Sequence, residues 1–149
     1  MLHVRQVQVA RECALTLPSS GRAYGTPLKS NVRPQMTLDE LAAAVASTSP
    51  DPVVQRLASL LVLWKDDDTS VQALRNDVER YIGNTWIELT EVHKTVYALW
   101  SEFVNTAINS IGGMTMNERL FFFDLASEFD LASTDEQRER IYVKLLARP

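Results

Sequence analysis

Apolar residues recur at steps of three and four positions along the chain after residue 37, which is the spacing of a helix with one buried face. The pattern divides into segments that begin near residues 38, 52, 71, 85, 116 and 134. No alternating run of β-branched residues of strand length occurs after residue 37. Short connections favour antiparallel neighbours. The sequence therefore predicts an all-α fold, a compact antiparallel bundle of five to six helices.

Capping residues mark the expected helix starts. Three starts have the form of a capping box, in which a hydroxyl side chain is followed three positions later by a Glu. These pairs are Thr37 and Glu40, Thr115 and Glu118, and Ser133 and Glu136. Asp51 precedes Pro52 at a further start. Gly83 and the pair Gly112-Gly113 are expected to end the third and fourth helices.

The fourth helix is expected to be the longest, from about residue 85 to residue 111. Its polar residues fall on one narrow stripe, and nearly all its other positions are apolar. The stripe consists of Glu88, Glu91, Thr95, Glu102, Asn105 and Asn109. A helix that is apolar around most of its circumference is packed against several neighbours. We therefore predict that this helix is the central one.

Residues 1–36 differ from the rest in composition. Three prolines and two glycines fall between Pro18 and Pro34, a density that stops regular structure. Residues 4–17 contain neither, and their spacing favours a short helix. We expect an N-terminal arm over residues 1–36, a short helix plus a Pro/Gly-rich loop, followed by a helical domain over residues 37–149.

The two segments carry opposite charge. Residues 1–36 hold five basic residues and one acidic residue, for a net charge of +4, whereas residues 37–149 hold ten basic and 18 acidic residues, for −8. Because phosphate contacts need clustered Lys and Arg, the acidic helical domain is not expected to bind nucleic acid. Ser133 to Glu136 would begin the second helix of a helix-turn-helix, and its two acids would repel phosphates.

Length and composition indicate one ordinary globular protein of 149 residues with 46% apolar residues. The longest apolar stretch, Leu57 to Trp64, is too short to span a membrane. The first residues lack the pattern of a secretory signal, and Cys13 is the single cysteine. We therefore expect a cytoplasmic protein with no membrane partner.

The acidic run from Asp66 to Ser70 is the strongest candidate for a metal site. Asp66, Asp68 and Ser70 have the first, third and fifth positions of a calcium loop, but Val71 replaces the expected Gly and Asp77 the expected Glu. Acids before a helix also serve as caps. We favour the capping interpretation and predict no metal site.

Other candidates for catalysis are weaker. Two carboxylate pairs share an expected helix face, Glu88 with Glu91 and Asp124 with Glu128. Both pairs fall on expected solvent stripes, without the Glu-x-x-His pattern of a helical di-metal site. The two histidines, His3 and His93, belong to no recognisable nucleophile motif. The sequence predicts no catalytic residue and no cofactor, and an enzyme is the less favoured class.

An aromatic stripe runs along the expected fourth helix. Trp86, His93 and Trp100 recur every seven residues, with Tyr97 between them. Such a ridge either binds a partner or forms a core seam whose ring N–H groups find acceptors. We favour the core seam. Alternatively, these residues together with Trp64 line a pocket between helices.

Phe121 is the principal candidate for partner binding. It is one of three consecutive phenylalanines, and one helix cannot bury all three on a single side. It shares an expected stripe with three polar residues, Asn117, Asp124 and Glu128. An exposed Phe surrounded by polar groups is typical of an interface. Coverage by residues 1–36 is an equally good interpretation.

Two functions from different classes follow. The first is a non-catalytic module that docks on another protein, for example an antitoxin- or immunity-type inhibitor of a basic partner. The alternative is a small enzyme or ligand-binding bundle with an aromatic pocket between helices. A homo-oligomer is compatible with both. A third hypothesis assigns the basic residues 1–36 to an acidic surface, either nucleic acid or the helical domain itself.

Overall fold

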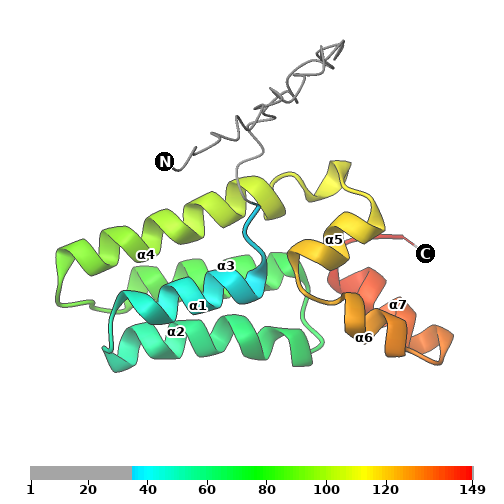
Figure 1. Cartoon of the computed structure of the whole chain (residues 1–149), viewed down its shortest axis with the longest axis horizontal. Coiled ribbons are helices and arrows are strands. Elements are labelled where there is room, and N and C mark those ends of the chain that lie inside the picture. Colours follow the sequence, from blue (N-terminus) through cyan, green and yellow to red (C-terminus); the bar gives the residue numbers. More distant parts are fainter. Residues whose placement is uncertain (1–34, 149) are drawn as a thin grey trace, which may run out of the picture. The chain divides into compact units, whose positions relative to one another are not determined.

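The structure of the chain is a computed structural model that describes residues 35–148. The short N-terminal helix and the Pro/Gly-rich loop predicted above, with His3 and Cys13, lie outside the described residues. Within residues 35–148 every regular element is helical, which confirms the all-α prediction. Figure 1 shows the arrangement of the seven α-helices.

The first four helices carry most of the length. They are α1 (Leu38–Thr48), α2 (Pro52–Leu63), α3 (Val71–Asn84) and α4 (Thr90–Phe103). A 3-10 turn, Trp64–Asp66, extends α2, and a π-helical segment, Val104–Ile108, extends α4. The helix α1 packs against both α2 and α4, and α3 packs against α2 and the π-helical segment.

Three shorter helices complete the domain after a 3-10 turn at Ile111–Gly113. They are α5 (Met116–Phe122), α6 (Ala126–Leu131) and α7 (Asp135–Lys144). Phe123 joins this part to the first four helices, since its ring lies 5.6 Å from Trp64 and 5.6 Å from Phe103. Phe123 and Phe103 are fully buried.

Most of the predicted helix starts are confirmed. Thr37 and Thr115 form complete capping boxes, and Asp51 caps α2 with Pro52 in its first turn. Ser70 caps α3. The third capping box is shifted by one residue from the prediction: Thr134 is the N-cap, and its partner is Gln137. A Gln serves as well as a Glu because either side-chain oxygen accepts the backbone N–H.

The fourth helix differs from the prediction at its start and in its place. It begins at Thr90, because residues 85–89 are not helical; among them Ile87 is buried between the exposed Trp86 and Glu88. It is also not central: α1 lies between α2 and α4 in Figure 1. Tyr97, a member of the expected core seam, is exposed, and so is Leu89, another apolar position of the expected helix. The predicted stop at Gly83 is wrong as well, since α3 continues to Asn84.

The expected fifth helix is interrupted after Phe122. Asp124 has a φ of 52°, in the left-handed region that ends a helix, and α6 then begins at Ala126. The Asp124 carboxylate accepts a hydrogen bond of 2.8 Å from the backbone N–H of Asp39, in the first turn of α1. The break therefore places the Asp124 carboxylate at the N-terminus of α1. A negative charge is favourable there because of the helix dipole and because the first N–H groups of a helix have no partner within it.

Candidate functional site

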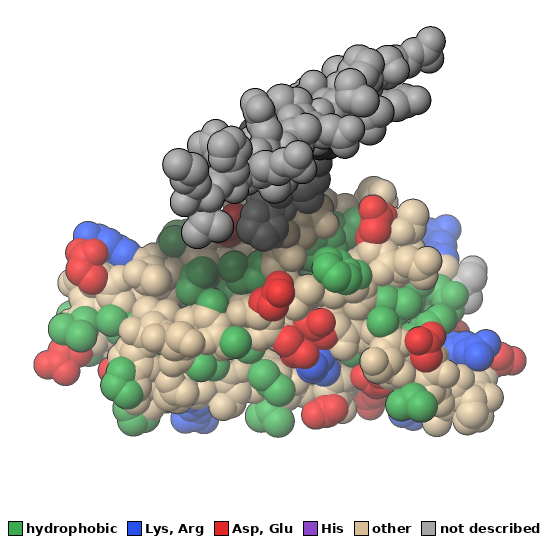
Figure 2. Space-filling view, in the orientation of Figure 1, with side chains coloured by type: hydrophobic (Ala, Val, Ile, Leu, Met, Phe, Trp, Pro, Cys, Tyr) green, Lys and Arg blue, Asp and Glu red, His purple; other side chains and the backbone are tan. Residues whose placement is uncertain are grey.

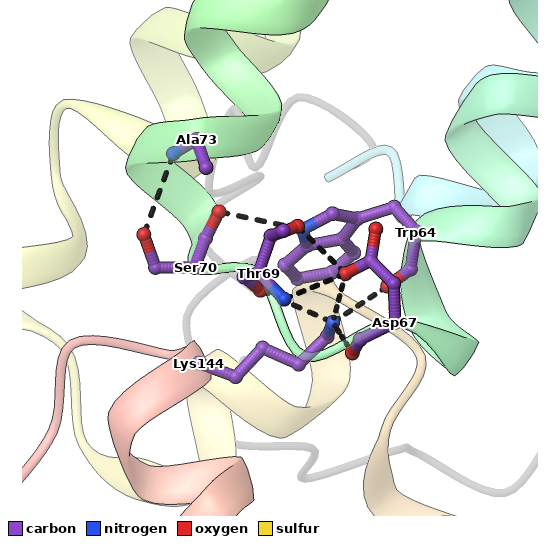
Figure 3. Close-up of polar contacts among 6 residues, drawn as sticks. All are labelled: Trp64, Asp67, Thr69, Ser70, Ala73 and Lys144. Atoms are coloured by element: carbon purple, nitrogen blue, oxygen red, sulfur yellow. Dashed lines mark hydrogen bonds and ion pairs between the residues drawn. The ribbon is translucent and has the colours of Figure 1, made fainter.

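The acidic run between α2 and α3 encloses a cation from the protein itself. The Lys144 ammonium donates hydrogen bonds of 2.6 Å to the carbonyl oxygens of Trp64 and Asp67, and one of 3.2 Å to that of Thr69. It also lies 3.1 Å from Asp67 Oδ1 and 4.0 Å from the centre of the Trp64 ring. Figure 3 shows these contacts converging on the lysine. None of the proposed calcium ligands takes part in these contacts: Asp66 and Asp68 are exposed, and the Ser70 hydroxyl accepts the backbone N–H of Ala73 as the cap of α3.

The electrostatics of Asp67 reflect this arrangement. Burial alone would raise the pKa of its carboxyl, but hydrogen bonds from the hydroxyl and the backbone N–H of Thr69 outweigh that effect. The Lys144 ammonium acts in the same direction, so that the pKa of Asp67 lies below its usual range. The loop carboxylate is held in its charged form at neutral pH.

Lys144 is a residue that the sequence analysis missed. It is buried, although lysine is almost never buried without a partner. Its position between Val143 and Leu145 on the last helix is a weak local signal, and nothing in the sequence relates it to the acids before α3. A second buried cation, Arg119, donates hydrogen bonds to the carbonyl oxygens of Met114 and Leu145. The helices α5 and α7 are therefore held by charged hydrogen bonds.

A groove of about 710 Å³ lies beside this loop, between it and the helices α6 and α7. We call it the acidic groove. Its charged residues are Lys65, Asp66, Asp67, Asp68, Glu128, Glu136, Glu139, Arg140 and Lys144. Lys65 is ion-paired with Asp39 at 2.6 Å, and Lys144 is held by the loop. Five carboxylates and Arg140 therefore form no ion pair within residues 35–148.

Two exposed apolar side chains lie in the acidic groove. Leu131, the last residue of α6, is 82% exposed, and Val143 on α7 is also exposed. Neither was singled out in the sequence. The signal for Val143 was available, because Ile141 and Leu145 at a spacing of four define the inner face of α7 and leave Val143 outside it. Figure 2 shows apolar and acidic side chains interspersed over one face of the helical domain.

The predicted partner-binding stripe is only partly assembled. Phe121 is 53% exposed, whereas Phe122 and Phe123 are buried, as expected for three consecutive aromatic residues. Asn117 and Glu128 are exposed, and Glu128 lines the acidic groove. Asp124 is half-buried and binds the first turn of α1. The stripe is broken because α5 and α6 are separate helices, so the Asp124–Glu128 pair does not share one helix face.

The predicted aromatic residues gather at one cavity, with one exception. A cavity of about 740 Å³ lies between the end of α3, the connecting residues 85–89 and α4. We call it the aromatic cavity, because Trp86, His93, Tyr97 and Trp100 all line it. Its other lining residues are Glu79, Ile82, Gly83, Thr85, Ile87, Glu88 and Thr90. Trp64 is not among them: it is 2% exposed in the core, where its Nε1 donates to the Ser70 carbonyl at 3.3 Å.

The core-seam interpretation of the aromatic stripe is wrong for two of its members. Trp86 is 84% exposed and Tyr97 is exposed, while Trp100 is 3% exposed. The Trp100 Nε1 has no hydrogen-bond partner among the described residues. On successive turns of α4, His93, Tyr97 and Trp100 lie on the same side of the helix, but only Trp100 is buried in the core.

Two general findings bound the chemistry of residues 35–148. No cluster of three or more His, Cys, Asp or Glu side chains with the geometry to hold a metal ion occurs in this part of the chain. None of the helices described is both long enough and apolar enough to cross a bilayer. Comparisons of the chain with protein-family models, with curated proteins and with solved structures find no match.

Proposed function

We propose that this protein is a non-catalytic binding module whose acidic groove docks a basic, partly apolar segment of another protein. The observation that carries the proposal is the position of Leu131 and Val143, two exposed apolar side chains within a groove lined by unpaired carboxylates. An inhibitor of the antitoxin or immunity type, which neutralises a basic partner, is the concrete version that we favour.

The negative charge of the acidic groove favours a positively charged partner. Carboxylates come from three separate elements: Asp66 and Asp68 precede α3, Glu128 lies on α6, and Glu136 and Glu139 lie on α7. Within the described residues only Arg140 opposes them without an ion pair of its own. Like charges that a fold gathers without pairing steer an opposite charge towards them and raise its rate of association.

The exposed apolar residues add burial energy, which electrostatic attraction alone does not supply. Leu131 is almost wholly exposed and contributes little to the core, but a partner that covered it would gain about 1.5–3 kcal/mol of burial energy. Surrounding polar groups would form the rim of such an interface. The groove is also preorganised, since Lys144 fixes the loop that forms one wall. A fixed wall lowers the entropy lost on binding.

The test uses the full chain and a synthetic probe, an amphipathic helical peptide of Lys and Leu. We expect saturable binding at low salt by calorimetry, and weaker binding as salt increases. Replacing the Leu residues of the peptide with Ser at unchanged charge should weaken binding by about tenfold or more, because the apolar anchor is lost.

A pair of variants locates the binding surface. The double substitution Leu131→Ser and Val143→Ser should weaken the Lys/Leu peptide by about tenfold or more. Trp86→Ser removes an equally exposed apolar side chain far along the sequence and should leave the peptide's affinity unchanged. If the double variant bound as tightly as the native chain, or if the Ser-containing peptide bound as well as the Leu-containing one, the acidic groove would not be the docking site.

A further inference from the structure

The aromatic cavity has the size and the lining of a ligand site. Its volume of about 740 Å³ lies within the range of about 300–1,000 Å³ typical of small-molecule pockets. Two walls are aromatic, with Trp86 on the α3–α4 connection and Tyr97 on α4. The buried Trp100 contributes to the wall nearest the core. Aromatic side chains from two elements therefore meet around one hollow.

The lining determines the charge of a suitable ligand. None of its 11 residues is a Lys or an Arg, whereas Glu79 and Glu88 are both present. Glu79 is ion-paired with Arg75 at 2.9 Å, which leaves Glu88 as the exposed carboxylate beside Trp86. A phosphate or carboxylate ligand would find no Lys or Arg there. The faces of Trp and Tyr rings are themselves negative, so carboxylates and rings both favour a cation.

Folding does not explain the exposure of Trp86 or the burial of the Trp100 N–H without an acceptor among the described residues. At 84% exposure, Trp86 buries little of its ring, although Trp is the residue with the most apolar surface to bury. Trp100 has a buried indole N–H without an acceptor among the described residues, which is unfavourable in a folded protein. Ring placements that the fold alone does not favour are typical of binding sites.

We propose that the aromatic cavity binds a small organic cation with a methylated ammonium group, through cation–π contacts with Trp86 and Tyr97 and the charge of Glu88. Methylated ammonium groups are weakly hydrated and are recognised by such rings elsewhere in proteins. The site is separate from the acidic groove, since the two share no lining residue. The proposal does not depend on the docking function.

Choline and its uncharged isostere, 3,3-dimethylbutan-1-ol, test the proposal, because they share one shape and differ in charge. The indole N–H resonances of the three tryptophans report where each probe binds. Choline should shift the resonances of Trp86 and Trp100 in a saturable manner and leave that of Trp64 unmoved, since Trp64 does not line the cavity. The isostere should bind about tenfold more weakly or not at all.

Matched variants assign the binding to the rings. Trp86→Ala should weaken choline by about tenfold, while Trp86→Phe, which keeps a ring, should retain part of the affinity. Leu131→Ala truncates an equally exposed side chain in the acidic groove and should leave choline binding unchanged. Equal affinity of the isostere and choline for the native chain, or unchanged choline affinity in Trp86→Ala, would each overturn the proposal.

The same chemistry could come from a free metabolite or from a methylated lysine in a protein. A peptide with one trimethyllysine, compared with its unmethylated form, provides the second arm of the experiment. Tighter binding of the methylated peptide than of choline would identify a protein-borne cation, and the reverse order would identify a free one. If neither choline nor the methylated peptide bound, the cation site would be excluded.

Discussion

Two connections, the one between α2 and α3 and the one between α3 and α4, differ in how the tryptophan side chains and polar groups around them are paired. In the first, the buried Trp64 donates its N–H to the Ser70 carbonyl, and Lys144 satisfies three further carbonyl oxygens. In the second, Trp86 is exposed, and Trp100, which lines the same cavity from α4, has a buried N–H without an acceptor within residues 35–148. One connection is saturated with hydrogen bonds, and the other is not.

This difference separates structural polar groups from those available to a ligand. The three acids before α3 looked like a metal site in the sequence, but Lys144, 77 residues away from Asp67, already occupies the place of a cation. The aromatic residues before and on α4 looked like a core seam, but the fold leaves most of them outside. Charged and aromatic residues are therefore better candidates for ligand binding where they have no partner within the protein.

The largest expected effect is on the α2–α3 connection. Lys144→Met keeps most of the side-chain volume but removes the ammonium from three carbonyl oxygens and from the Asp67 carboxylate. We expect the free energy of unfolding to fall by about 3–5 kcal/mol in urea titrations, since one partner of a buried charged network is lost. Lys94→Met is the control, because Lys94 forms an exposed pair with Glu91, and it should cost less than about 0.5 kcal/mol. Similar losses in both variants would mean that Lys144 does not hold the loop.

A smaller effect compares the two buried tryptophans directly. Trp64→Phe removes a hydrogen bond of 3.3 Å and weakens the contact with the Lys144 ammonium. Trp100→Phe removes an N–H that has no acceptor among the described residues, so the variant loses ring volume only. We expect the Trp64 variant to be less stable than the Trp100 variant by about 1–2 kcal/mol in the same titrations. Equal stabilities would show that the two connections do not differ in this way.

Local signals explain how much of the fold was predictable. The hydroxyl–Glu pairs at Thr37 and Thr115, and Asp51 before Pro52, give helix starts that need only neighbouring residues. The hydroxyl–Glu form predicts Ser133 as a cap because Glu136 stands three positions later, whereas the structure has Thr134 as the cap with Gln137 in the same role. A capping box involves only four consecutive residues, so a helix start can be predicted from local sequence to within one residue.

Long-range contacts explain what was not predictable. A helix was expected to continue through Asp124, but that residue takes a positive φ so that its carboxylate reaches α1, which precedes it by 85 residues. Periodicity likewise included Trp86 in a helix, because its spacing from His93 and Trp100 is helical although it lies in the non-helical connection before Thr90. Four of the five predicted aromatic residues still meet at one cavity, whereas nothing local relates Lys144 to the loop that it fixes.

A pH titration sharpens the description of the α2–α3 connection. The pKa of Asp67 lies below its ordinary value of 3.8 in the folded chain, so the charged carboxylate contributes stability above that pH. This contribution is lost as the pH falls through the lowered pKa. Asp67→Asn should therefore be less stable than the native chain near pH 6, by less than about 1 kcal/mol because the carboxylate is partly exposed. The difference should shrink as the pH approaches 3, and a difference that grew with acid would contradict the assigned direction.

The smallest expected effect concerns Trp86, and it decides whether the α3–α4 connection is open as described. Trp86→Ala should change the free energy of unfolding by no more than about 0.5 kcal/mol, because an exposed ring contributes little to the core. Its neighbour Ile87 is buried, so Ile87→Ala should cost about 2–4 kcal/mol in the same measurement. The exposure of Trp86 next to the buried Ile87 requires this contrast. If Trp86→Ala were as destabilising as Ile87→Ala, the indole would serve the fold, and no ligand would be needed to account for its position.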